Sequence, residues 1–272
     1  MKSAVTISLV PEARGGPFVF WDDLAAGFAS AAAHGFDAVE IFTPDANAIP
    51  LSTVQGLLAQ HSLQLAAVGT GAGWVKHKFR LTDPDAEVRA RARDFINGII
   101  NFAGILGAPA ILGSMQGRWD GAVAREQALD WLGESLHALG KRAGGHWQCF
   151  LYEPLNRYET NLFTRAGDAA KFIEERGIKN VKLLCDLFHM SIEETDVATA
   201  LRAVAPQLGH VHWADSNRHA VGFGHTDIAP IAAALRDIGY AGYLSAEVLP
   251  LPDSDAAAKQ TSASIRRWFP PA

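Results

Sequence analysis

Four ionisable side chains, three carboxylates and one imidazole, lie at the ends of short apolar segments in the second half of the chain. They are Glu153, Asp186, His212 and Glu247, and each ends or follows a run with the composition of a β-strand. Three carboxylates brought together in an apolar interior would repel one another strongly. A divalent cation removes this repulsion, and carboxylate oxygens with one imidazole favour Mn²⁺, Mg²⁺ or Co²⁺ over thiolate-bound zinc. These residue types therefore predict one divalent metal ion, with Mn²⁺ preferred.

The four side chains can meet only if the segments that carry them are neighbouring parallel strands. The 272 residues alternate short β-type runs with longer amphipathic runs, without a break in composition between them. The predicted strands are 6–10, 38–42, 63–68, 110–113, 148–153, 181–186, 210–213 and 243–248. The predicted helices are 22–34, 51–61, 85–106, 122–140, 164–176, 196–204, 228–238 and 253–268. Such alternation predicts parallel strands with crossover helices, and this number of units predicts a single (β/α)₈ TIM-barrel domain over residues 1–272.

A barrel of this kind explains how the ionisable residues would act together. Barrel enzymes place catalytic groups where the strands end and the following loops begin. Side chains alternate in direction along a strand, so each of the four residues shares a face with the residue two positions earlier. All four can then point toward the barrel axis at one level. Any single one could be a helix cap or a surface group, but a purely structural role does not explain why all four lie at the ends of successive strands. Glu40 ends the second predicted strand, where it is placed to hydrogen-bond a ligand or a neighbouring strand.

Composition and charge exclude several other classes of protein. The formal net charge is −5 and no long basic run is visible, which argues against a nucleic-acid partner. Cys149 and Cys185 have neither metal-binding spacing nor a disulfide pattern. The first ten residues are too short an apolar run for a signal peptide, and no stretch is long enough to span a membrane. We therefore expect a cytoplasmic protein without a membrane partner.

Two stretches in the second half resemble the ketose 3-epimerases that act on D-tagatose or D-psicose. These enzymes belong to the xylose-isomerase-like TIM-barrel superfamily of sugar isomerases and epimerases. The stretches are EPLNRYET at 153–160 and CDLFHMSIEE at 185–194. The resemblance continues through His210–His212, Arg218 and Glu247, and it covers about 150–248. In the first half only the barrel rhythm agrees.

The resemblance implies a role for seven residues. It implies metal ligands at Glu153, Asp186, His212 and Glu247, proton transfer by Glu153 and Glu247, and contacts to the sugar by His189, Arg218 and Glu159. It also implies a small sugar substrate and a homo-oligomer, either a dimer or a tetramer. Trp74 and Trp119 are candidates for stacking on a sugar or for packing under the loops.

The predicted chemistry is epimerisation at carbon 3 of a free ketose. A metal on the carbonyl and hydroxyl oxygens would stabilise the negative charge that forms when the neighbouring carbon loses its proton. One glutamate would remove this proton, and the other would return a proton to the opposite face of the planar enediolate. An aldose–ketose isomerisation would use the same enediolate but return the proton elsewhere.

Other functions fit parts of the pattern. On the same scaffold they include hydroxypyruvate-type isomerisation and dehydration of an inosose. The chain departs from the ketose-epimerase pattern at Trp213-Ala214-Asp215 and in the loop 219–224, which leaves the substrate open. An endonuclease IV-like DNA-repair enzyme would need further histidine ligands, whereas the third and fourth strands end in glycine and hydroxyl residues. A non-catalytic sugar-binding barrel would be expected to have lost a ligand or a glutamate, and none is lost.

Overall fold

A computed structural model describes residues 1–270 and contains a closed barrel of parallel strands. The barrel strands are β1 (Lys2–Ser8), β3 (Ala38–Phe42), β4 (Gln64–Gly69), β5 (Ala110–Leu112), β6 (Phe150–Tyr152), β7 (Val181–Asp186), β8 (Leu208–His212) and β9 (Tyr243–Ala246). Each strand pairs with the next along the chain, and β9 pairs with β1 to close the barrel. The predicted (β/α)₈ TIM barrel is therefore confirmed.

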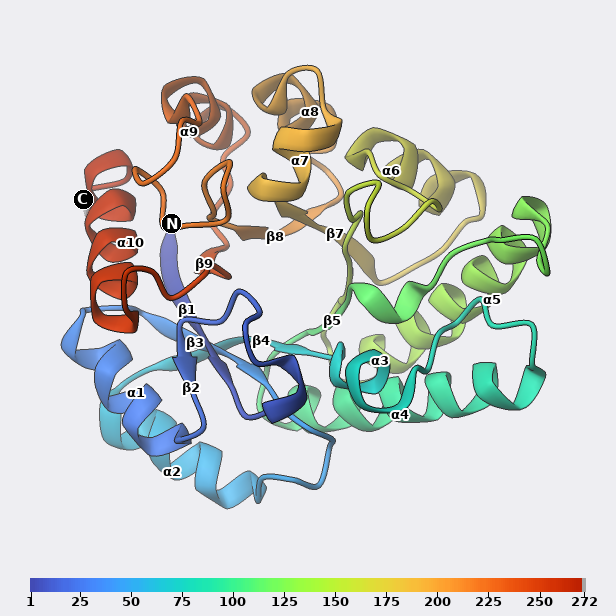
Figure 1. Ribbon diagram of the computed structural model, residues 1–272, viewed down its shortest axis with the longest axis horizontal. Coiled ribbons are helices and arrows are strands. Elements are labelled where there is room, and N and C mark those ends of the chain that lie inside the picture. Colours follow the sequence, from blue (N-terminus) through green and yellow to red (C-terminus); the bar gives the residue numbers. More distant parts are fainter. Residues whose placement is uncertain (271–272) are drawn as a thin grey trace.

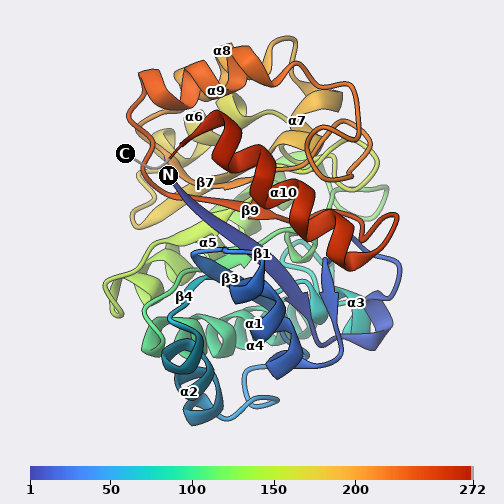
Figure 2. The same ribbon diagram turned by 90° about the vertical axis from the view of Figure 1, so that its left-hand side faces the viewer.

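Helices cover the outside of the barrel, as Figures 1 and 2 show. They are α1 (Leu24–Ala33), α2 (Leu51–His61), α4 (Ala86–Ile105), α5 (Arg125–Gly144), α6 (Ala166–Glu175), α8 (Val197–Ala203), α9 (Ile228–Asp237) and α10 (Ser254–Trp268). Five of them begin at an aspartate whose carboxylate accepts a backbone N–H of the first turn. In Figure 2 the closing helix α10 crosses the outside of the barrel beside β9 and β1.

Several short elements were absent from the sequence prediction. A two-residue strand, β2 (Phe20–Trp21), pairs with β1, and helix α3 (Ala72–His77) follows β4. Helix α7 (Leu187–Glu193) begins directly at the end of β7, without an intervening loop. Turns of 3₁₀-helix lie at 11–13 and 114–116. All of these elements lie in the segments that follow barrel strands, where they shape the opening of the barrel.

The first strand begins four residues earlier than its predicted start and ends two residues earlier. Residues 4–8 pair with β3 and residues 2–5 pair with β9, whereas the chain leaves the sheet before Pro11, which has no N–H to donate. This shift does not affect the strands that carry the predicted site.

On the side of strands β4 to β7, the barrel interior contains an apolar cluster. Ala67, Ile111, Leu151 and Leu184, from four consecutive strands, form a cluster separate from the large core between strands and helices. Leu151 and Leu184 are fully buried and lie two positions before Glu153 and Asp186. The strand ends are therefore fixed by a packed layer beneath them. Among the described residues, no helix is both long and apolar enough to cross a membrane.

Candidate metal centre and substrate pocket

The structure brings together the four ionisable residues that the sequence singled out. Asp186 and His212 end β7 and β8 and are paired in register, while Glu153 and Glu247 directly follow β6 and β9. The backbone N–H of Glu153 still donates to Leu112 of β5, which holds it in line with the sheet. One ligand atom from each of the four residues lies within 4.8 Å of the others.

The imidazole of His212 lies at the centre of this cluster. Its Nδ1 atom is 3.3 Å from Glu247 Oε2, 3.5 Å from Asp186 Oδ2 and 3.7 Å from Glu153 Oε1. Both His212 Nδ1 and Glu153 Oε1 are buried and have no hydrogen-bond partner. Buried polar atoms are rarely left without a partner. A cation among these donors would satisfy both atoms, so the residues present fit a divalent metal ion.

The pKa values of two carboxyl groups in the cluster shift in opposite directions. Burial, helped by the nearby Glu247 and Asp186, raises the pKa of Glu153 well above its usual value. Burial would also raise the pKa of Asp186, but Arg218 and His189 lower it overall. Repulsion from the neighbouring carboxylates contributes to the raised pKa of Glu153, and a bound cation would relieve this repulsion.

Arg218 reaches into the cluster from the loop after β8. Its Nη2 atom donates to Glu247 and lies 3.3 Å from Asp186 Oδ2, and its guanidinium lies over the ring of Phe188 at 4.8 Å. The backbone of Arg218 has φ +59, a left-handed conformation that is uncommon outside glycine. The buried carboxylate of Asp215 holds the surrounding loop in this shape by accepting backbone N–H groups at residues 216, 222 and 226.

The other two predicted sugar contacts lie beside Arg218. His189 Nδ1 is 2.7 Å from Asn156 Nδ2, and its Nε2 atom faces the cluster. Its Nε2 atom is 3.2 Å from Arg218 Nη1. The Glu159 side chain is 45% exposed and accepts from the same Asn156 amide at 3.3 Å. Glu159 caps no helix, because α6 begins after Arg165.

A second group of ionisable residues lies behind His212. Glu40 accepts from Nε2 of His212 at 3.1 Å and from Nε2 of His210 at 2.9 Å. These three side chains could also surround a metal ion. However, each carboxylate oxygen of Glu40 accepts a hydrogen bond from a different imidazole. Neither oxygen of Glu40 and neither Nε2 atom is left without a hydrogen-bond partner. The hydrogen-bonding atoms of this group are therefore satisfied within the group, whereas those around Nδ1 of His212 are not.

The carboxylate of Glu153 packs closely against the Cα of a glycine. A Cβ atom at Gly113, which follows β5, would lie 2.7 Å from Glu153 Oε2. The glycine leaves room for the carboxylate to turn toward the cluster. In the sequence analysis Gly113 was only the last residue of a predicted strand. Nothing near it in the sequence indicates its contact with Glu153.

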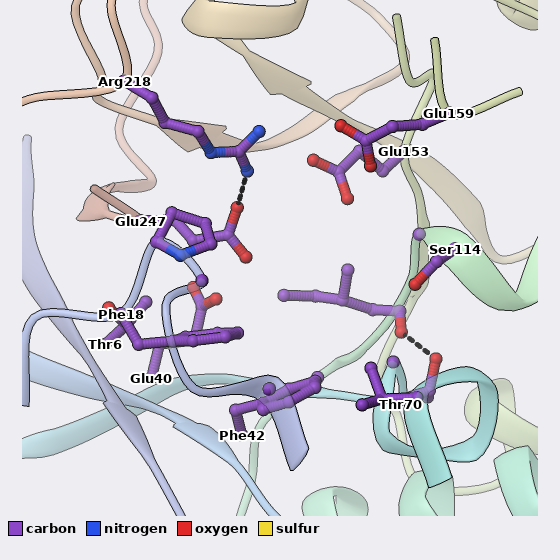
Figure 3. A pocket seen from close by; sticks show the side chains of 18 of the residues that line it. Thr6, Phe18, Glu40, Phe42, Thr70, Ser114, Glu153, Glu159, Arg218 and Glu247 are labelled. Atoms are coloured by element: carbon purple, nitrogen blue, oxygen red, sulfur yellow. Dashed lines mark hydrogen bonds and ion pairs between the residues drawn. The ribbon is translucent and has the colours of Figure 1, made fainter. Parts of the chain in front are cut away.

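A pocket of about 530 Å³ opens beside the cluster and includes Glu153, Glu247, His189, Arg218 and Glu159 in its wall. Figure 3 shows Glu247 and Glu153 on different sides of this pocket, with Arg218 near Glu247 and two aromatic rings across the pocket from Arg218 and Glu153. These rings, which the sequence analysis did not single out, belong to Phe18 and Phe42.

The two tryptophans that were candidates for stacking on a sugar lie elsewhere. Neither Trp74 nor Trp119 is among the residues that line the pocket. The indole N–H of Trp119 donates to the backbone oxygen of Asn161 at 2.9 Å, and Lys78 lies over the ring of Trp74. Their alternative role, packing under the loops, is the one that the structure supports.

Comparisons with known proteins agree with this architecture. The model of the xylose isomerase-like TIM barrel family matches residues 28–268. A D-psicose 3-epimerase of Agrobacterium fabrum is 30% identical over 217 residues, which cover 76% of this chain and 73% of that enzyme. A 3-dehydro-D-guloside 4-epimerase of Escherichia coli is 37% identical over 111 residues, 41% of this chain and 42% of its own.

A solved structure extends the agreement in fold to nearly the whole chain. The structure of a D-allulose 3-epimerase of Methylomonas sp. in complex with D-allulose superposes with a TM-score of 0.81. The match covers 99% of this chain and 98% of that one at 23% sequence identity. Because the family model matches residues 28–268, this chain belongs to the xylose isomerase-like TIM barrel family.

Proposed function

We propose that this protein is a divalent-metal-dependent epimerase that inverts the carbon next to the ketone of a sugar, with carbon 3 of a ketose as the first candidate. The chain is a sugar epimerase or isomerase, like the two relatives that it matches over most of their length. The observation that supports the metal-dependent reaction is a pair of buried atoms without a hydrogen-bond partner. They are His212 Nδ1 and Glu153 Oε1, and they lie within a cluster of three carboxylates and one imidazole.

In this proposal Glu153, Asp186, His212 and Glu247 hold the metal ion. All four are buried or nearly so, which excludes water from competing freely for the same ion. When bound, a divalent cation would stabilise the negative charge that develops on the carbonyl oxygen as the neighbouring carbon loses its proton. Mn²⁺ is the preferred ion because the donor set is rich in oxygen and contains one imidazole.

Glu153 and Glu247 are proposed to move the proton. They follow strands β6 and β9, so their carboxylates enter the site from different sides of the barrel opening. A substrate carbon between them can lose its proton to one carboxylate and receive one from the other on the opposite face. Because the reaction is reversible, each glutamate is the base in one direction and the acid in the other.

His189 and Arg218 are proposed to hold the oxygens at the reacting end of the sugar. Nε2 of His189 and Nη1 of Arg218 lie 3.2 Å apart, so both side chains can contact one substrate oxygen. Glu159 at the rim can accept a hydrogen bond from a sugar hydroxyl. Fixing these oxygens places the reacting carbon between the two glutamates.

The names of two relatives point to one shared chemistry. Epimerisation at carbon 3 of a 2-ketose and at carbon 4 of a 3-dehydro sugar both invert a carbon adjacent to a ketone. Deprotonation at this carbon gives the same type of enediolate in each case. This supports the proposed step more strongly than it supports a particular position on the sugar.

Proton exchange with solvent tests the proposal whichever epimer is formed. We would incubate the Mn²⁺-loaded protein in D₂O with D-psicose, D-fructose, D-tagatose, hydroxypyruvate and an inosose, and follow each compound by NMR. The proposal expects deuterium at the carbon beside a sugar ketone, together with the epimer. Formation of an aldose, loss of water from the inosose, or turnover of hydroxypyruvate alone would instead support one of the alternative reactions.

A further inference from the structure

The backbone of Glu153 is held on both sides by the segment that ends β5 and follows it. Its N–H donates to the carbonyl oxygen of Leu112 at 3.0 Å, and its own carbonyl oxygen accepts from Nε2 of Gln116 at 2.9 Å. Because β5 ends at Leu112, the backbone of this strand does not continue the ladder beside Glu153. The side-chain amide of Gln116 therefore takes the place of a backbone N–H at this strand end.

The amide of Gln116 also binds the glycine against which the Glu153 carboxylate packs. Its Nε2 atom donates to the carbonyl oxygen of Gly113 at 3.0 Å, in addition to that of Glu153. The Glu153 carboxylate lies so close to this glycine that a Cβ there would be 2.7 Å from Oε2. One amide thus fixes two backbone segments, and the separation of these segments sets the room that the carboxylate has.

A buried tyrosine sets the orientation of the Gln116 amide. The hydroxyl of Tyr152 donates to Gln116 Oε1 at 2.8 Å, and both residues are fully buried. If the amide turned by 180°, its oxygen would face two carbonyl oxygens, and these buried acceptors would lose their donors. The two bonds from Nε2 and the one to Oε1 therefore hold the amide in a single orientation.

The turn that carries Gln116 is itself packed into the core. Met115 and Gln116 are both fully buried, and the carbonyl oxygen of Met115 accepts from the N–H of Leu81 at 2.8 Å. The carbonyl oxygen of Gln116 accepts from Thr82 Oγ1 at 3.3 Å. Glu153 lies in the pocket wall, as Figure 3 shows, whereas Gln116 does not line the pocket. Gln116 can therefore affect a ligand only through the residues that it holds.

We propose that Gln116 is a positioning residue for proton transfer by Glu153. This inference rests on the proposed function, because it concerns the glutamate that exchanges a proton with the sugar. A displacement of about 1 Å at a reacting group can cost about 100-fold in rate. Gln116 opposes such a displacement by fixing both the backbone of Glu153 and the glycine beside its carboxylate. Tyr152 acts through Gln116, because its hydroxyl orients the amide.

The first test removes the two N–H donors and keeps the length of the side chain. For Gln116→Met in D₂O at saturating Mn²⁺, kcat for proton exchange with D-psicose should fall by about tenfold or more. KM should change by less than about twofold, because the groups that contact the sugar are unaltered. If D-psicose does not react, the sugar of the panel that exchanges fastest takes its place.

A control variant separates loss of position from loss of stability. Val54→Ala, at a fully buried position on α2, creates a small cavity in the core and should keep kcat. Circular dichroism would confirm that each variant is folded at the temperature of the assay. Equal kcat values in Gln116→Met and Val54→Ala would overturn the inference. A rise in KM without a fall in kcat would do the same, since it would assign Gln116 to binding.

Tyr152→Phe gives a second, smaller change, because it removes one hydroxyl oxygen and keeps the ring. Alone it should lower kcat by about threefold, and in the Gln116→Met background it should have no further effect, because there is no amide left to orient. Effects on kcat that multiply in the double variant would show that the two residues act independently, which contradicts the inference.

Two further measurements separate failure of this inference from failure of the proposed function. If the wild-type protein exchanges no proton with any sugar of the panel, both fail together. If Glu153→Gln exchanges as the wild type does, Glu153 is not the group that moves the proton, and the role of Gln116 fails with it. Exchange that is lost in Glu153→Gln but unchanged in Gln116→Met would leave the proposed function intact and overturn this inference alone.

Discussion

Glu40 Oε1 lies 3.1 Å from Nε2 of His212, on the side of the imidazole opposite the three carboxylates that surround Nδ1. A carboxylate at Nε2 keeps the proton on that nitrogen and leaves Nδ1 free to bind a metal ion. Partners of this kind fix both the tautomer and the orientation of a ligating histidine. The same carboxylate also binds His210, which anchors it between strands β3 and β8.

Replacing Glu40 is therefore expected to weaken metal binding although Glu40 is not a proposed ligand. Glu40→Gln should raise the dissociation constant for Mn²⁺ by about 10–100-fold, as loss of such partners does in metalloenzymes. Isothermal titration of the metal-free protein with MnCl₂ measures this. Glu134→Gln, at an exposed position on α5, serves as the control. Equal affinity in the Glu40 and Glu134 variants would show that Glu40 has only a structural role.

Metal binding should also depend on pH. Burial would lower the pKa of His212, but the carboxylates of Glu247 and Glu40 raise it well above the usual value, and burial raises the pKa of Glu153. Protons on these two groups compete with the cation, so affinity for Mn²⁺ should rise as pH increases and binding should release protons. Titrations at pH 7 in buffers of different ionisation enthalpy count these protons. A binding enthalpy that is independent of the buffer would contradict this expectation.

Gly113 provides a test of how closely the position of Glu153 controls activity. In Gly113→Ala the added Cβ would meet Glu153 Oε2 at 2.7 Å, so the carboxylate must shift from its place. We expect kcat/KM for proton exchange to fall about 10-fold or more, since small displacements of a catalytic group cost this much. Gly56→Ala, where a Cβ meets nothing within 4 Å, should retain full activity. Unchanged exchange in Gly113→Ala would mean that Glu153 is not held where proposed.

Asp215 links the stability of the protein to pH. Burial would raise its pKa, but the backbone N–H groups of Gly222, Thr226 and Ser216 lower the pKa to about 2. Because this value lies below that of about 3.9 in an unfolded chain, ionised Asp215 stabilises the fold above pH 4, and this contribution disappears as pH falls toward 2.

The Asp215→Asn variant should reveal this contribution. Its free energy of unfolding should be about 1–3 kcal/mol lower than that of the wild type at pH 7. The difference should shrink as the pH is lowered from 5 to 2, and urea unfolding at several pH values measures it. Asp94→Asn, an exposed position on α4, is the control. A difference that stays constant with pH would show that the charge of Asp215 is not the stabilising feature.

The sequence was sufficient to predict the barrel and the cluster because both follow local rules. Strands alternate with helices, and the residues that end successive strands must meet at one edge of the barrel. An acidic residue at a strand end can be either a helix cap or a ligand, and Asp186 is placed to be both. One of its oxygens accepts the N–H of Phe188 at the start of α7, as a helix cap does, and the other faces the cluster.

The remaining features depend on contacts between residues that are distant in the sequence. Glu40 and His210 are 170 positions apart, and nothing in either segment indicates that they bond. The stack of Phe18 on Phe42 depends on the path of the loop after β1, which sequence periodicity does not describe. Helix α7 was missed because it begins directly at Asp186, where a loop was expected.

The most direct test is to locate the metal ion. Metal-free protein would be titrated with MnCl₂ and then crystallised at saturating Mn²⁺, and anomalous scattering would show the position of the ion. We predict one Mn²⁺ per chain, bound by Glu153, Asp186, His212 and Glu247 together. A protein that binds no Mn²⁺, or a peak that lies away from these four side chains, would contradict the account.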